Sequence, residues 1–324
     1  MLMYPFIFKP VLKNYIWGGN AIRSFKGLTP SEEIIAESWE ISAIECNYSV
    51  VANGAMEGLT IADLINRFGS KLLGEKVIQQ FGLTFPLLIK LIDAQENLSI
   101  QVHPDDTLAQ VRHRSWGKTE MWYVVKAVPG STLYSGFSQP IDEEEYVHRV
   151  ENNSLIDVLK RHEVKEGDVF FLPAGRIHAI GAGCFIAEIQ QTSDITYRIY
   201  DYNRKDANGN SRELHTELAK EAIDYTVYPD YRTTYSPLLN QSVRLAQCNY
   251  FTVNLLEMDL PIERNCAALD TFIIYICVEG KATLQDERHN EFNIHQGQTV
   301  LIPAETHKVM ILPDSQVKLL EVYI

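Results

Sequence analysis

One motif occurs twice in this chain, and this repeat constrains the fold more than any other feature of the sequence. Residues 167–174 read GDVFFLPA, and residues 297–304 read GQTVLIPA. A histidine follows each copy, His178 after the first and His307 after the second. In both copies a glycine turn leads into a short apolar strand that ends at a proline. The repeat therefore predicts two similar β-rich units along one chain.

The rest of the chain also predicts mainly β-structure. Short apolar or alternating runs between Gly, Pro, Asn and Asp indicate strands at 86–93, 121–126, 168–172, 184–191 and 272–279. Amphipathic patterns predict helices at 61–68, 142–161 and 213–225. The order of glycine turn, buried strand, Pro-Ala and second turn resembles a motif of cupins. Two copies imply two cupin-like antiparallel β-barrels of jelly-roll type, a bicupin, with a few peripheral helices.

The segment LSIQVHP at 98–104 gives the strongest indication of function. On a strand, Gln101 and His103 point to one face while their apolar neighbours point to the other. Glu120 lies next to an aromatic and β-branched strand, and His178 follows the first copy of the repeat. Two imidazoles, a carboxylate and an amide oxygen suit zinc, and they could also hold cobalt, manganese or iron. We expect one zinc ion per chain, bound by these four residues; the alternative is that they lie on separate strands and share no site.

The second copy of the repeat lacks such partners. The strands expected before it, 269–278 and 281–285, contain no His and no Gln-x-His pair, so we expect His307 to be a loop or packing residue. We therefore expect residues 1–240 to form the metal-binding catalytic domain with N-terminal and helical elaborations. Residues 241–324 should form a C-terminal cupin-like domain without a metal site.

Composition restricts the partners. The net charge of -13 over 324 residues argues against a nucleic-acid or anionic membrane surface. The chain has no apolar run long enough to cross a bilayer, and its first ten residues lack the pattern of a signal peptide. Five cysteines without CxxC spacing indicate reduced, mostly buried thiols. We expect a cytoplasmic monomer or weak homo-oligomer that acts on a small molecule.

The metal motif and several other segments of the chain resemble motifs of a known family. Residues 15–19, 98–105, 117–123 and 195–201 closely resemble motifs of the type I phosphomannose isomerases, also called mannose-6-phosphate isomerases. Members interconvert mannose 6-phosphate and fructose 6-phosphate with one bound zinc, and the family pattern maps its ligands onto Gln101, His103, Glu120 and His178. The chain resembles the short bacterial subgroup, because the interval from Glu120 to His178 cannot hold the helical insertion of the longer enzymes.

The resemblance also implies catalytic residues. Isomerisation moves a proton between neighbouring carbons through a cis-enediol, so charge builds up on oxygen. Arg198 is implied as the cation that stabilises this charge; the alternative is a surface arginine paired with Asp194 or Asp201. Glu188 is implied as an active-site carboxylate, and its apolar neighbours should raise its pKa as a general base requires. The alternative for Glu188 is an outward carboxylate in solvent.

The substrate phosphate requires cationic and hydroxyl donors. Strand alternation places Ser99 with Gln101 and His103, and Lys118 with Glu120. The resemblance supports a phosphate role for Lys90, Ser99 and Lys118, and we also expect Lys118 to be catalytic. The alternative for each lysine is a surface residue. Trp17 is expected to form an aromatic wall for the sugar, or else to be a core tryptophan.

Two other functions remain open. One is a non-catalytic sugar-phosphate-binding or regulatory bicupin, and the other is a metal-dependent oxygenase of the same fold. Cupin oxygenases usually present a His-x-His pair to iron, whereas the first residue of the pair is Gln101 here. A sugar binder without turnover would be expected to lose a metal ligand or Arg198, and this chain keeps all of them.

Overall fold

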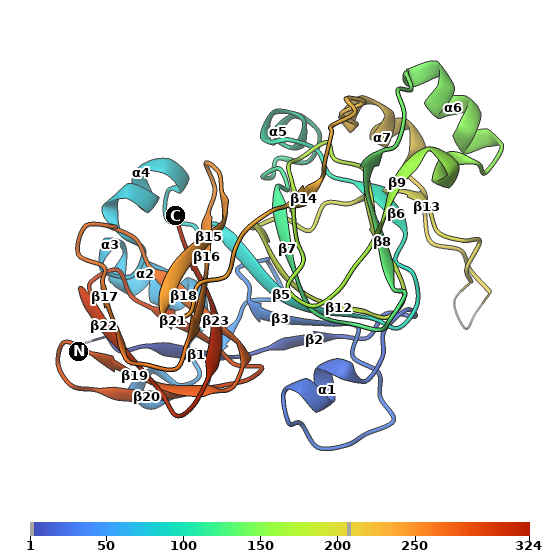
Figure 1. Cartoon of the computed structure of the whole chain (residues 1–324). Coiled ribbons are helices and arrows are strands. Elements are labelled where there is room, and N and C mark those ends of the chain that lie inside the picture. Colours follow the sequence, from blue (N-terminus) through green and yellow to red (C-terminus); the bar gives the residue numbers. More distant parts are fainter. Residues whose placement is uncertain (1–2, 206–208) are drawn as a thin grey trace.

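The computed structural model describes residues 3–205 and 209–324. Two β-rich units lie side by side, and each consists of two antiparallel sheets (Figure 1). The seven-stranded sheet of the first unit has the order β14 (Arg232–Thr233), β10 (Val169–Leu172), β7 (Glu120–Ala127), β12 (Cys184–Gln191), β5 (Leu87–Ala94), β3 (Glu37–Ile41) and β2 (Val11–Lys13). It faces the five-stranded sheet β13 (Tyr197–Tyr200), β6 (Ile100–Val102), β11 (His178–Ile180), β8 (Thr132–Phe137) and β9 (Leu159–Glu163).

The second unit repeats this arrangement. Its seven-stranded sheet has the order β15 (Gln241–Gln247), β16 (Thr252–Met258), β23 (Val317–Tyr323), β18 (Ile273–Glu279), β21 (Thr299–Ile302), β1 (Phe6–Lys9) and β4 (Val50–Val51). Its four-stranded sheet is β17 (Ile262–Asn265), β22 (Lys308–Pro313), β19 (Lys281–Asp286) and β20 (Glu291–His295). The predicted mainly-β bicupin of jelly-roll type is confirmed. In the described residues the paired sheets keep separate hydrogen-bond ladders, so each unit is a two-layer jelly roll rather than a closed barrel.

Strands near both ends of the chain belong to the second unit. Strand β1, near the N-terminus, pairs with β21 of the repeated motif and with β4. Lys76 donates from its Nζ to the carbonyl oxygen of the C-terminal residue Ile324 at 3.0 Å. The seven-stranded sheet of the second unit therefore combines strands from residues 6–51 with strands from residues 241–323.

A large apolar core joins the two seven-stranded sheets. Phe185, Ala187 and Ile189 of β12 belong to the same buried cluster as Val253 of β16 and Ile274 of β18. Ile186, between them in sequence, lies in a different cluster inside the first jelly roll. The alternation predicted for this strand is thus correct, and it turns the intervening polar side chains towards the interior of the first unit.

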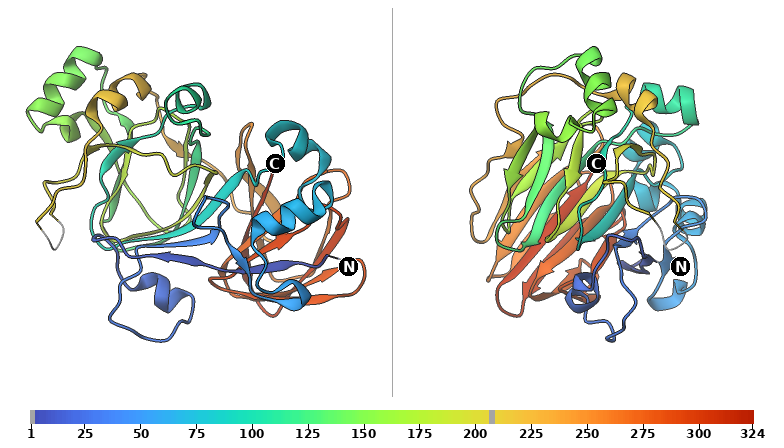
Figure 2. Two further views of the ribbon diagram at one scale, coloured as in Figure 1. Left: turned by 180° about the vertical axis from the view of Figure 1, so that it is seen from behind. Right: turned by 90° about the vertical axis from the view of Figure 1, so that its right-hand side faces the viewer.

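Helices lie at the periphery (Figure 2). α2 (Ile61–Phe68) is found as predicted and begins with a capping box between Thr60 and Asp63. The helix predicted at 142–161 is wrong in its second half: α6 (Glu143–Glu151) ends where Asn153 adopts a φ of 54°, and η2 (Leu155–Val158) and β9 follow. α7 (Thr216–Ala222) is shorter than predicted. The remaining helical elements are α1 (Ala21–Phe25), η1 (Gly54–Met56), α3 (Ser70–Leu73), α4 (Glu75–Phe81) and α5 (Asp106–His113).

No helix in the described part of the chain combines the length and apolar character needed to cross a membrane. The five cysteines are unpaired, and Cys46 is the exposed one.

Candidate metal and substrate site

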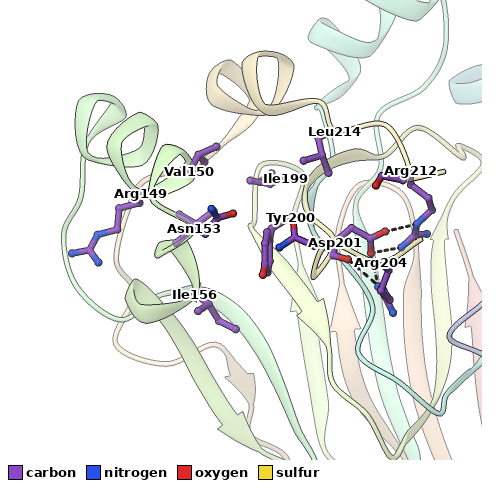
Figure 3. A pocket seen from close by; sticks show the side chains of 13 residues that line it. Arg149, Val150, Asn153, Ile156, Ile199, Tyr200, Asp201, Arg204, Arg212 and Leu214 are labelled. Carbon is purple, nitrogen blue, oxygen red and sulfur yellow. Dashed lines mark hydrogen bonds and ion pairs between the residues drawn. The ribbon is translucent and has the colours of Figure 1, made fainter. Parts of the chain in front are cut away.

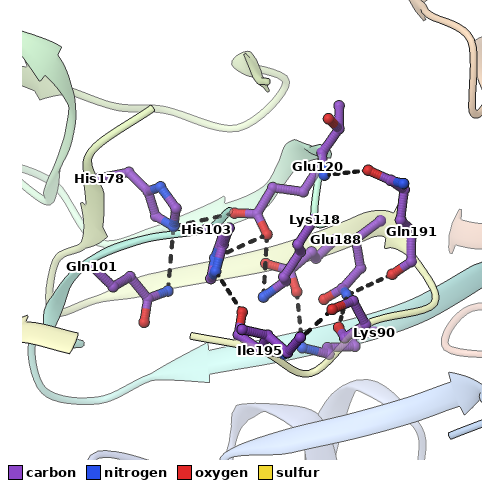
Figure 4. A network of polar contacts seen from close by, with 12 residues as sticks. Lys90, Gln101, His103, Lys118, Glu120, His178, Glu188, Gln191 and Ile195 are labelled. Carbon is purple, nitrogen blue, oxygen red and sulfur yellow. Dashed lines mark hydrogen bonds and ion pairs between the residues drawn. The ribbon is translucent and has the colours of Figure 1, made fainter. Parts of the chain in front are cut away.

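Three of the predicted metal ligands meet inside the first jelly roll. His103 follows β6, Glu120 begins β7 and His178 begins β11, and their candidate ligand atoms all lie within 4.8 Å of one another. All three side chains are buried. Nε2 of His103 lies 3.5 Å from one Glu120 oxygen, and Nε2 of His178 lies 3.3 Å from the other (Figure 4).

Backbone carbonyls orient both imidazoles towards Glu120. Nδ1 of His103 lies 2.9 Å from the carbonyl of Ile195, and Nδ1 of His178 lies 2.8 Å from that of Arg176. Because a carbonyl only accepts, each Nδ1 carries the proton and each Nε2 presents a lone pair. Burial lowers the pKa of His178 to about 4 and that of His103 well below its usual value. Both rings are therefore neutral near pH 7, the state that binds metal.

The fourth predicted ligand, Gln101, lies beside the cluster. It is directly opposite His178 in the β6–β11 ladder, and its amide nitrogen lies 3.3 Å from Nε2 of that histidine. Rotating the amide by half a turn exchanges its nitrogen and oxygen and turns the oxygen towards the same lone pair. Gln101 can thus offer an oxygen where the three other side chains converge.

The cluster contains polar atoms whose hydrogen bonds the described residues do not satisfy. Nε2 of His103 and both carboxylate oxygens of Glu120 are buried without a hydrogen-bond partner among these residues. Nζ of Lys118 lies 3.3 Å from Glu120, but this contact does not satisfy the carboxylate geometrically. Burial, followed by repulsion from Glu188, raises the pKa of Glu120 to about 8. Unsatisfied buried groups are costly, and a divalent cation would satisfy them, so the residues fit a metal ion.

A cavity of about 350 Å³ lies beside the cluster, lined by Gln101 and by all six predicted catalytic and substrate residues. These six are Trp17, Lys90, Ser99, Lys118, Glu188 and Arg198. The same cavity has other lining residues that the sequence did not predict as site residues, among them Tyr15, Glu37, Trp39 and Arg212. Glu37 and Trp39 are two residues apart on one strand, so strand alternation places them on the same face. This spacing could have identified both as site residues from the sequence. Arg212 lies outside any regular element, so no such spacing could identify it.

Glu188 has a different environment from the one expected. Its oxygens lie 3.0 Å from Nζ of Lys90, on the neighbouring strand β5, and 2.8 Å from the donating indole nitrogen of Trp122. Burial raises the pKa of Glu188, but the positive charges of Lys90 and Lys118 outweigh it and lower the pKa to about 2. The predicted rise is therefore wrong. The alternative of an outward carboxylate is wrong as well, because Glu188 is buried.

Lys90 is the centre of this charge arrangement. It lies 3.7 Å from Glu37 in addition to its contact with Glu188. Burial lowers its pKa, but the two carboxylates more than compensate and raise the pKa above its usual value. Lys90 is therefore a buried cation, not the surface lysine of the alternative interpretation.

Arg198 also has no ordinary surface pairing. It lies opposite Gln101 in the β13–β6 ladder, and its Nη1 donates to the carbonyl of Glu213 at 2.9 Å. Its Nε is buried without a hydrogen-bond partner in the described residues. Asp201, one of its expected partners, is held instead by Arg204 and Arg212 (Figure 3). That ion-pair group lines a second cavity of about 180 Å³, and Arg212 lines both cavities.

Fold and site together define a bicupin with a candidate metal site. Comparison with known families narrows the class: residues 6–122 match "Phosphomannose isomerase type I, catalytic domain", and residues 241–324 match "Mannose-6-phosphate isomerase, cupin domain". The chain is 34% identical over 306 residues to mannose-6-phosphate isomerase ManA of Bacillus subtilis, covering 94% of each chain. It is 32% identical over 302 residues to the mannose-6-phosphate isomerase of Streptococcus mutans, covering 92% of each. The chain belongs to the type I mannose-6-phosphate isomerase family.

Solved structures agree with this assignment. A crystal structure of mannose 6-phosphate isomerase from Bacillus subtilis superimposes with a TM-score of 0.89 and 31% identity, covering 99% of this chain and 100% of that one. A phosphomannose isomerase from Salmonella typhimurium, with 17% identity, 98% coverage of this chain and 99% of that one, shares the fold with a TM-score of 0.80.

Proposed function

We propose that the protein is a zinc-dependent aldose-ketose isomerase that interconverts mannose 6-phosphate and fructose 6-phosphate. The observation that carries the proposal is the position of the His103–Glu120–His178 cluster beside a cavity lined with cationic, hydroxyl and carboxylate side chains. The names of the relatives support the same reaction. We place the chemistry in residues 1–240, and we propose a cytoplasmic monomer or weak homo-oligomer.

The reaction must move one proton from C2 to C1 of the sugar through a cis-enediol. When bound by Gln101, His103, Glu120 and His178, zinc supplies Lewis-acid stabilisation of negative charge on the substrate oxygens. Arg198 supplies a second positive charge, since it faces the cavity without an ion-pair partner within 4.0 Å in the described residues. A guanidinium that is already oriented can stabilise the developing charge without reorganisation.

Glu188 is the proposed acceptor and donor of the proton. With its pKa at about 2 it is ionised at neutral pH, and Lys90 and Trp122 hold its orientation. A substrate phosphate near Lys90 would compete for the ammonium group and bring the pKa of Glu188 closer to that of an effective base. Lys118, next to both Glu120 and the cavity, is positioned to donate a proton to a substrate oxygen.

The remaining contacts would bind the substrate. Ser99, Lys90 and Lys118 are the proposed phosphate donors. Trp17, whose ring centroid lies 5.6 Å from that of Tyr15, would form an aromatic wall along the sugar.

A coupled assay of mannose 6-phosphate conversion tests the proposal, run on protein of known metal content before and after chelation and zinc restoration. We expect activity to be lost with the metal and regained with zinc. Arg198→Ala should lower kcat/KM by about a hundredfold or more. Arg232→Ala is the matched control, because Arg232 also has a buried Nε but does not line the cavity. A folded, zinc-loaded protein without turnover on any hexose phosphate would refute the isomerase and favour a sugar-phosphate-binding bicupin.

A further inference from the structure

One polar side chain of the second unit contacts the first unit near the candidate metal ligands. Tyr250 lies in the turn between β15 and β16, and its hydroxyl donates to Oδ2 of Asp106 at 2.7 Å. Asp106 begins α5, three residues after the candidate ligand His103. The two residues are 144 positions apart in sequence. The hydrogen bond therefore links the C-terminal jelly roll to the segment that leaves the metal cluster.

The other oxygen of Asp106 reaches the segment that enters β7. Oδ1 accepts from the backbone nitrogen of Gly117 at 2.8 Å and from the side-chain nitrogen of Gln191 at 2.9 Å. The side-chain oxygen of Gln191 in turn accepts from the backbone nitrogen of Thr119 at 2.8 Å. One carboxylate thus holds the backbone on both sides of Lys118.

The backbone of Lys118 and its neighbour Gly117 also contacts the segment 104–106. The backbone nitrogen of Lys118 donates to the carbonyl of Pro104 at 3.1 Å, next to His103. Gly117 packs so closely that an added Cβ would lie 2.6 Å from the backbone of Asp105 and Asp106. Three consecutive amides, 117 to 119, are therefore fixed immediately before the candidate ligand Glu120.

We propose that Tyr250 is a positioning residue: through Asp106 it fixes the backbone that presents Lys118 and Glu120 to the site. The tyrosine orients the Asp106 carboxylate, whose Oδ2 accepts no other hydrogen bond within the described chain. Burial and the neighbouring carboxylate raise the pKa of Tyr250, so its hydroxyl remains a donor at physiological pH. This role gives the C-terminal unit a part in activity although it contributes no lining residue to the cavity.

The inference rests on the proposed function only for its kinetic test. Tyr250→Phe removes the hydroxyl and keeps the ring. We expect kcat to fall about threefold to tenfold with KM within about twofold, and zinc to bind more weakly by a similar factor. This effect is smaller than the roughly tenfold to hundredfold effect of groups that contact a metal ligand directly, because Tyr250 acts through Asp106. Amide exchange at 117–119 in the metal-free protein should accelerate.

Tyr235→Phe is the matched control. The hydroxyl of Tyr235 donates to the carbonyl of Gly167 at 2.6 Å, so this variant also loses one tyrosine hydrogen bond to the first unit, away from the cluster. It should leave the three readouts unchanged. If Tyr250→Phe matched Tyr235→Phe in zinc affinity and in exchange at 117–119, the inference would be overturned. Zinc affinity and amide exchange can be measured without turnover, so they test the role of Tyr250 even if the isomerase proposal fails.

A double-mutant cycle separates positioning from general loss of stability. Asp106→Ala should reproduce or exceed the effect of Tyr250→Phe, and adding Tyr250→Phe to it should change zinc affinity no further. Asp106→Asn keeps an oxygen for Gly117 and Gln191, and its amide nitrogen can donate to the Tyr250 hydroxyl, so this variant should retain most of the zinc affinity. If Tyr250→Phe does not fold, a zinc affinity of Asp106→Asn as low as that of Asp106→Ala would overturn the proposal. Additive effects of Tyr250→Phe and Asp106→Ala would contradict the proposal.

Discussion

The two jelly rolls share a fold, but they differ in how the hydrogen bonds of a buried carboxylate are satisfied. In the first unit, both oxygens of Glu120 lack hydrogen-bond partners among the described residues, and so does the nearby Nε2 of His103. In the second unit, Glu321 is equally buried but has four donors. The first interior also borders a cavity, whereas in the second unit Tyr275, one of the donors to Glu321, belongs to a buried apolar cluster.

The four donors to Glu321 come from both sheets of the second unit. Arg264 reaches across from β17 and donates two hydrogen bonds, at 2.8 and 2.7 Å. Asn254 and Tyr275, directly opposite Glu321 on the neighbouring strands, donate at 2.9 and 3.1 Å. A bidentate arginine with two further donors satisfies a carboxylate fully. The same architecture therefore supports either a stable buried ion pair or an unsatisfied polar cluster, and the latter is typical of functional sites.

Glu120→Gln should separate function from stability in the first unit. We expect zinc affinity to fall by at least about a hundredfold, because even residues behind metal ligands contribute tenfold to a hundredfold. The metal-free variant should be about as stable as the wild type at pH 7, since Glu120 with a pKa of about 8 is mostly protonated there and glutamine replaces one neutral group with another. Zinc titration and denaturant unfolding measure both effects. A marked loss of metal-free stability would contradict the comparison.

Glu321→Gln should show the reverse. Removing one partner of a buried ion pair leaves the other uncompensated, so we expect the free energy of unfolding to fall by about 3 kcal/mol. Activity and zinc content per folded molecule should remain unchanged, because Glu321 lies in the other unit. Replacing Arg264 and Glu321 together by apolar residues should recover part of the stability. Loss of zinc from folded Glu321→Gln would contradict the conclusion that the metal ligands belong to the first unit alone.

The pH dependence of metal-free stability should also distinguish Glu120. Its folded pKa, about 8, lies above the usual 4.5, so its stabilising contribution is lost as pH rises through 8. His103 and His178 have lowered pKa values, so their contribution is lost only as pH falls below 6.5. Glu188, with a pKa of about 2, is constant above 4.5. Between pH 6.5 and 8 we therefore expect the wild type to lose about 1–2 kcal/mol, and Glu120→Gln to lose none of it. Unfolding series at fixed pH values measure this slope.

The smallest effect is expected at the second histidine of the repeat. His307 is exposed, and the metal-ligand cluster of the described residues does not include it. His307→Ala should change the free energy of unfolding by less than about 0.5 kcal/mol and leave metal content unaltered. Metal analysis and thermal unfolding of the purified variant check this. Loss of metal would show that the two copies of the motif are equivalent.

Local sequence patterns were sufficient for the fold class and for the clustered residues His103, Glu120 and His178. The family resemblance was needed for Lys90, Glu188 and Arg198, and cavity residues such as Glu37 and Arg212 were not predicted. The Gln101-x-His103 spacing and the repeated strand motif each depend only on strand alternation and turn chemistry, which act over a few residues. The pKa of Glu188 could not be predicted this way, because it depends on Lys90, brought next to it by the β12–β5 register. The end of α6 depends on a left-handed Asn153, and the Tyr250–Asp106 contact on packing between units.

Anomalous diffraction at the zinc absorption edge, from crystals of the purified protein, tests the central claim most directly. The account predicts one peak per chain, between Gln101, His103, Glu120 and His178, and none in the second jelly roll. A peak near His307 or Glu321, or a fully loaded protein with no peak at His103, would contradict it.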